Sequence, residues 1–108
     1  MDVFNISSLR SKLRASDQRY LEFLRAPSMS LGIYSLAAGA ADEQQPHTED
    51  EIYYVLSGRA SLLAGEEERE VEAGQLVFVK AGVVHRFHNI SEDLTLLVFF
   101  APPEGSLS

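Results

Sequence analysis

The chain has 108 residues, which is enough for one compact domain with a modest core and too few for two domains. Sixteen acidic against nine basic side chains give a formal charge of -7, which disfavours binding to nucleic-acid phosphates or to an anionic lipid surface. Because the chain has no cysteine, a disulfide framework, a thiolate metal site and a cysteine nucleophile are excluded.

The first predicted element is one short helix near the N-terminus, where Ile6, Leu9 and Leu13 recur at helical spacing. After it the pattern changes to short runs of β-forming residues separated by glycine and proline turn signals. Eight strands are predicted, over residues 20–24, 29–36, 51–56, 60–63, 69–72, 76–79, 84–90 and 94–100. Such short connections favour an antiparallel sandwich or barrel, because parallel strands need long crossovers.

The residues most suited to binding a metal are two histidines and their polar neighbours. Gln45 and His47 are two positions apart, which places both side chains on one face of an extended segment. A tight turn after His47 would bring Glu51 to the same point, and a later strand would bring His85. An amide oxygen, two imidazoles and a carboxylate suit a divalent transition metal. By spacing alone, however, each histidine is more simply read as a packed or surface residue.

The glycines around these residues complete a pattern that resembles the two sequence motifs of the cupin family. The first motif, G-x5-H-x-H-x3-E-x6-G, is matched by Gly39, Gln45, His47, Glu51 and Gly58. The second, G-x5-P-x-G-x2-H-x3-N, is matched by Gly74, Lys80, Gly82, His85 and Asn89. The chain departs from the motifs at Gln45, where they have histidine, and at Lys80, where they have proline.

The resemblance implies an all-β fold, an antiparallel jelly-roll (double-stranded β-helix) barrel with a short N-terminal helix. We expect a single cupin domain over residues 1–108, with a helical segment at 1–18, the β-barrel at 19–101 and a C-terminal tail at 102–108. The resemblance also implies that a metal binds in the barrel interior, as an ion of iron, manganese, zinc or nickel. Its expected ligands are Gln45, His47, Glu51 and His85. Type I phosphomannose isomerases, which are also cupin-like, use a Gln, His, Glu, His set.

Two functions are compatible with such a site. The first is a metal-dependent enzyme of the dioxygenase or isomerase type that acts on a small polar molecule. In that case Tyr53 is the candidate catalytic residue, with Tyr34 and Glu49 as other possible proton-transfer groups. The alternative is a non-catalytic cupin that binds or senses a small ligand and that can be metal-free. His88 points away from an inward-facing His85, so it is not counted as a ligand.

The expected partners are a small molecule and a second copy of the chain. A small barrel leaves apolar side chains exposed, so we expect a homodimer that covers Tyr54, Leu56, Leu62 and the apolar residues before position 7. No apolar run approaches the roughly 20 residues that span a bilayer, and the N-terminus does not have the pattern of a secretion signal. A cytoplasmic location with no membrane partner is therefore expected.

Overall fold

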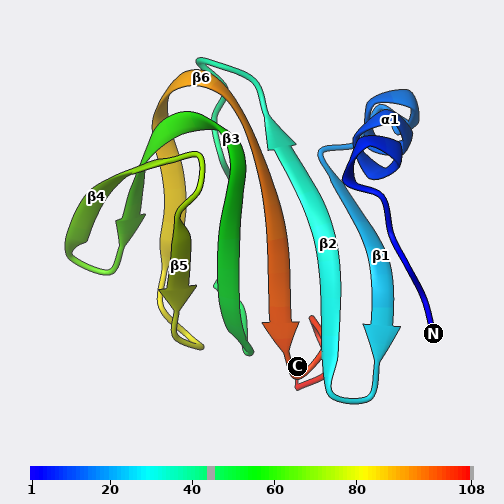
Figure 1. Cartoon of the computed structure of the whole chain (residues 1–108). Coiled ribbons are helices and arrows are strands. Elements are labelled where there is room, and N and C mark those ends of the chain that lie inside the picture. Colours follow the sequence, from blue (N-terminus) through cyan, green and yellow to red (C-terminus); the bar gives the residue numbers. More distant parts are fainter. Residues whose placement is uncertain (44–45, 108) are drawn as a thin grey trace.

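The computed structural model describes residues 1–43 and 46–107. One helix, α1 (Ile6–Ser16), is followed by six strands, which are β1 (Tyr20–Ala26), β2 (Met29–Leu36), β3 (Asp50–Ala64), β4 (Glu67–Glu72), β5 (Leu76–Val79) and β6 (His85–Ala101). All strand pairs are antiparallel, in the order β1-β2-β6-β3-β4, and β5 pairs with β3 (Figure 1). The predicted all-β antiparallel fold with a short N-terminal helix is confirmed.

The prediction of eight strands was wrong because two pairs of predicted strands are each one long strand. β3 contains the predicted runs 51–56 and 60–63, and β6 contains 94–100 and nearly all of 84–90. Residues near the predicted breaks bend these strands instead of ending them: Gly58 and Asn89 have positive φ, and the β3–β6 register shifts between Val55 and Ser61. A Cβ on Gly58 would lie 2.2 Å from the carbonyl oxygen of Asp93, so this bend requires glycine.

The core lies in the barrel interior and is formed by alternate residues of the strands. Tyr53, Val55 and Phe87 point inward as the alternation predicts, and Phe100 is the buried member of the Phe99–Phe100 pair. Phe78 is 63% exposed, because β5 turns Val79 inward. The expectation that Leu62 lies on the surface covered by a dimer was wrong, because Leu62 is buried in the core.

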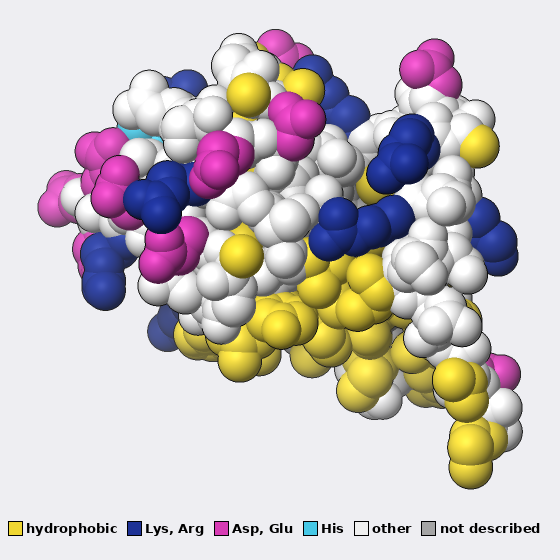
Figure 2. Space-filling view, turned by 45° about the horizontal axis from the view of Figure 1, so that its top comes forward, with side chains coloured by type: hydrophobic (Ala, Val, Ile, Leu, Met, Phe, Trp, Pro, Cys, Tyr) yellow, Lys and Arg dark blue, Asp and Glu magenta, His cyan; other side chains and the backbone are white. Residues whose placement is uncertain are grey.

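The outer face of the sheet is only partly covered. Leu9 and Leu13 of α1 pack on Ile33 of β2 and close the part of the sheet beside the helix (Figure 1). Farther along, Ile52, Leu76 and Phe78 are exposed on the paired strands β3 and β5. In Figure 2, hydrophobic side chains form a continuous area in the lower half of the view. α1 has 11 residues, and no helix in the described chain is long and apolar enough to cross a membrane.

Candidate metal centre

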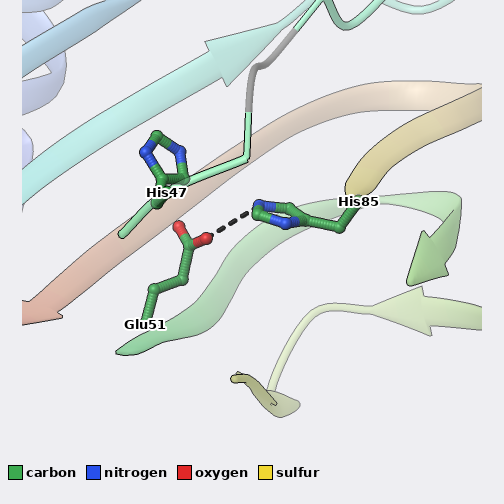
Figure 3. Close-up of side chains that lie close together, drawn as sticks. All are labelled: His47, Glu51 and His85. Atoms are coloured by element: carbon green, nitrogen blue, oxygen red, sulfur yellow. Dashed lines mark ion pairs between the residues drawn. The ribbon is translucent and has the colours of Figure 1, made fainter. Parts of the chain in front are cut away.

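Three side chains from separate parts of the fold converge inside the barrel. His47 comes from the segment between β2 and β3, Glu51 from the start of β3 and His85 from the first residue of β6 (Figure 3). One potential ligand atom from each lies within 4.8 Å of the other two, and residues 1–43 and 46–107 contain no other such group. Glu51 and His85 are buried, and His47 is half-buried. The fourth predicted ligand, Gln45, lies outside the described residues.

Backbone hydrogen bonds join the segment of His47 to the turn that precedes His85. The amide of Gly82 donates to the carbonyl oxygen of His47 over 2.8 Å. The amide of Ala81 donates to the Asp50 carboxylate over 2.9 Å. Gly82 has a φ of 80°, which glycine adopts without strain. These bonds hold the two motif segments together, although they are far apart in the sequence.

Glu51 and His85 form a buried pair. Nε2 of His85 lies 2.7 Å from Oε1 of Glu51 and 3.0 Å from the hydroxyl of Tyr53, while Nδ1 donates to the carbonyl oxygen of Val83. Burial lowers the pKa of His85, but the hydrogen bonds to Glu51 and Val83 outweigh it, so this pKa lies above its ordinary value. The imidazole therefore favours a proton, or another positive charge, at Nε2.

The second oxygen of Glu51 shows that a metal fits this group of residues. Oε2 is buried and has no hydrogen-bond partner in the described structure. A buried carboxylate oxygen without a partner is costly, so such atoms usually bind a donor or a cation. Two imidazole nitrogens and one carboxylate oxygen are a donor set that divalent transition metals accept.

A cavity of about 180 Å³ lies beside these residues. Its lining combines polar and apolar side chains, namely Tyr20, Tyr34, His47, Glu51, Tyr53, Val98, Phe100 and Glu104. The Tyr34 hydroxyl donates to Asp42 over 2.7 Å, and the other oxygen of Asp42 accepts from the amide of Phe87. Tyr34 is therefore fixed by a buried acceptor, which leaves its hydroxyl proton committed to Asp42.

Tyr20 differs from Tyr34, because its buried hydroxyl has no hydrogen-bond partner in the described structure. Burial raises its pKa far above the ordinary value, and the negative charges of Glu104, Glu22 and Glu51 raise it further. The phenol thus stays protonated and can donate one hydrogen bond to a molecule in the cavity. Its ring end lies against Gly32, where a Cβ would be 2.1 Å from the Tyr20 hydroxyl oxygen.

The segment after β6 packs against the site. Glu104 reaches the cavity, and its Oε2 lies 3.5 Å from Nδ1 of His47. Burial raises the pKa of Glu104, nearby carboxylates add to this effect, and His47 opposes it. The buried Glu49 carboxylate accepts hydrogen bonds from the Thr48 hydroxyl and from the amides of Gly105 and Leu107. Glu49 therefore anchors the C-terminal segment, and it does not line the cavity.

Sequence reasoning missed Tyr20 and Glu104. Gly32 in the middle of an apolar strand was a signal for Tyr20, because an interior glycine often marks a close approach of another group. No sequence pattern indicated that Glu104 would turn back to the cavity. The prediction that His88 points away from His85 agrees with the structure. Nε2 of His88 lies 3.0 Å from Oε1 of Glu68 on β4, and His88 is not part of the group formed by His47, Glu51 and His85.

Comparisons with known proteins agree on the fold. A family model described as "Cupin domain" matches residues 32–100. An uncharacterized protein of Streptomyces coelicolor is 50% identical over 105 residues, which are 97% of this chain and 100% of that protein. The solved structure of TT1209 from Thermus thermophilus is 26% identical, with a TM-score of 0.77, and 95% and 99% of the two chains are covered.

An enzyme is among the proteins with a similar structure. The DMSP lyase DddQ from Ruegeria pomeroyi is 23% identical, with a TM-score of 0.69, and the likeness covers 84% of this chain and 49% of that one. At this identity the likeness shows a shared fold.

Proposed function

The chain belongs to the cupin family, and we propose that it is a metal-dependent enzyme acting on a small polar molecule, of the dioxygenase or isomerase type. The observation that carries the proposal is the convergence of His47, Glu51 and His85, in which a buried oxygen of Glu51 has no hydrogen-bond partner among the described residues. These three residues would bind the metal, an ion of iron, manganese, zinc or nickel, with Gln45 as a fourth ligand.

A bound metal would supply a Lewis acid that polarises a carbonyl or hydroxyl oxygen, or a centre that activates oxygen. The chain's own residues would bind and orient the substrate. Tyr20 would donate a hydrogen bond to it, and Val98 and Phe100 would form the apolar wall that excludes water. Tyr53 would be the proton-transfer residue, because its hydroxyl lies 3.0 Å from Nε2 of His85 and lines the same cavity.

The cavity limits the class of substrate. A volume of about 180 Å³ holds roughly six groups of the size of a water molecule. Among the described residues, the lining contains two carboxylates, those of Glu51 and Glu104, and no lysine or arginine. We therefore expect a small substrate with hydroxyl or carbonyl oxygens rather than one that carries several negative charges. The lyase with a similar fold supports an enzymatic role only by showing that this type of barrel carries catalysis in that protein.

We further propose that the chain is a single domain that acts as a cytoplasmic homodimer. Ile52, Leu76 and Phe78 expose apolar surface on neighbouring strands, and Val3, Phe4 and Ile6 are also exposed. A second copy that covers either group of side chains would remove them from water.

The test is metal analysis of protein purified without a histidine tag, followed by anaerobic reconstitution with Fe(II), Mn(II), Zn(II) or Ni(II). The reconstituted protein would be screened for oxygen uptake with small organic acids and diketones and for isomerisation of small hydroxycarbonyl compounds. Turnover that disappears in a Tyr53→Phe variant with normal metal content would support the proposal. Full metal content without turnover on any compound would favour the binding role, and absence of metal binding would refute the metal-dependent function.

A further inference from the structure

The C-terminal segment adds a group to the metal centre that the motif residues do not include. We propose that Glu104 is a positioning residue, whose carboxylate holds the His47 imidazole with Nδ1 toward itself and so presents Nε2 to the metal. This inference rests on the proposed metal site and names a further part of it.

The contact between the two side chains gives the direction of the imidazole. Nδ1 of His47 lies 3.5 Å from Oε2 of Glu104, and the two side chains are 18% and 35% exposed. A histidine that carries its proton on Nδ1 has its lone pair on Nε2. A carboxylate beside the other nitrogen is a common means of fixing the orientation and tautomer of a metal-binding histidine.

His85 has the same arrangement with a different acceptor. Its Nδ1 donates to the carbonyl oxygen of Val83 over 2.8 Å, and its Nε2 faces Glu51. Both imidazoles of the group therefore have Nδ1 next to an oxygen atom. For His85 the backbone supplies this oxygen, whereas for His47 it comes from a side chain beyond the barrel.

Hydrogen bonds to both its backbone amide and its carbonyl oxygen fix the position of Glu104. Its amide donates to the hydroxyl of the fully buried Ser30 over 2.9 Å, and Arg25 donates to its carbonyl oxygen over 3.1 Å. Just after Glu104, the backbone amides of Gly105 and Leu107 donate hydrogen bonds to the Glu49 carboxylate. Glu49 lies two residues from His47 and two from Glu51, so one short segment holds both ligands and the anchor of Glu104.

The experiment compares wild type, Glu104→Ala and Glu104→Gln as metal-depleted full-length proteins. Competition titrations with Zn(II) and Mn(II) measure affinity, and we expect about a 10- to 100-fold loss in Glu104→Ala and a smaller loss in Glu104→Gln. Glu67→Gln is the matched control, because it removes the same charge from an exposed position on β4 and should leave affinity unchanged. Thermal unfolding checks that each variant is folded.

A second measurement separates positioning from a general effect of charge. The ¹⁵N shifts of His47 in the metal-free protein, above the pH range of histidine titration, should report the Nδ1–H form in wild type and a mixture in Glu104→Gln. If wild type binds no metal, the proposed function and this inference both fail. If wild type binds metal and Glu104→Ala binds it equally well, the inference alone is wrong. A loss of affinity with an unchanged His47 tautomer also overturns it, because the carboxylate then acts only through its charge.

Discussion

Nε2 of His85 lies 2.7 Å from Oε1 of Glu51, and both side chains are almost completely buried. A carboxylate and an imidazole withdrawn from water attract each other strongly only while the imidazole carries a positive charge. A divalent cation placed between them would take over that role from the proton. If the proposed metal binds here, protons and metal ions would therefore compete for this pair.

Removing either histidine of the group should abolish stable metal binding. We expect close to one divalent metal per chain in wild type and far less in His47→Ala and His85→Ala, because each variant loses one of the proposed ligands. His88→Ala is the matched control and should keep the wild-type metal content, since His88 contacts Glu68 instead. Elemental analysis provides the measurement, and equal metal content in all four proteins would contradict the assignment.

The buried pair should also give the metal-free protein a characteristic pH dependence. Because the pKa of His85 is raised in the folded state, its contribution to stability is full below the ordinary histidine pKa, about 6.5. The contribution is lost as the pH rises through the raised value. An NMR titration should show the His85 pKa above 6.5 in wild type and a lower value in Glu51→Gln. An unchanged value in the variant would mean that Glu51 is not the cause of the shift.

Glu49→Gln should destabilise the fold by about 2 kcal/mol, because an amide cannot accept all the hydrogen bonds that the buried carboxylate receives. Burial alone would raise the pKa of Glu49, but the hydrogen bonds from Thr48, Gly105 and Leu107 lower it below its usual value. The stabilisation is therefore full above the unfolded-state pKa, about 4.3, and disappears as the pH falls through the lower folded value. Urea unfolding of wild type and variant at neutral and acidic pH measures this, with Glu67→Gln as control.

The exposed apolar area predicts a dimer that a single charge disrupts. Wild type should have about twice the chain mass of 12.0 kDa by light scattering, and Phe78→Asp should shift it toward the monomer. Because Phe78 is exposed within one chain, the variant should still fold, which circular dichroism would verify. A wild-type mass of 12.0 kDa at micromolar concentration would rule out the dimer.

Gln45→His tests the departure from the family motif. If Gln45 binds the metal through its amide oxygen, a histidine there would add a third imidazole and raise affinity for Ni(II) and Cu(II) more than for Mn(II). Competition titrations across these metals measure the series. An unchanged series would mean that Gln45 does not reach the metal, which would leave His47, Glu51 and His85 as the protein ligands.

Much of the barrel could be predicted because its determinants are local. Alternation along one strand placed Tyr53 and Val55 inside, and the motif spacing grouped His47 with Glu51 and His85. The exposed position of Phe78 could not be predicted in this way, because the four residues of β5 are all apolar and their sequence does not show which side chains face the core. Glu104 could not be assigned, because its place depends on contacts with Ser30 and Glu49 that form only in the folded protein.

The long pairing of β3 with β6 also bears on the order of events during folding. Its register runs from Asp50 opposite Ala101 to Ala64 opposite His85, so every paired residue is distant in the sequence. Pairings of this kind form slowly, because a long loop must close before the contacts stabilise it. Since Glu51 lies near one end of this pairing and His85 at the other, the two side chains meet only after the strands have paired and bent. Binding of the proposed metal should therefore be a late event, in which the ion enters a barrel that has already closed.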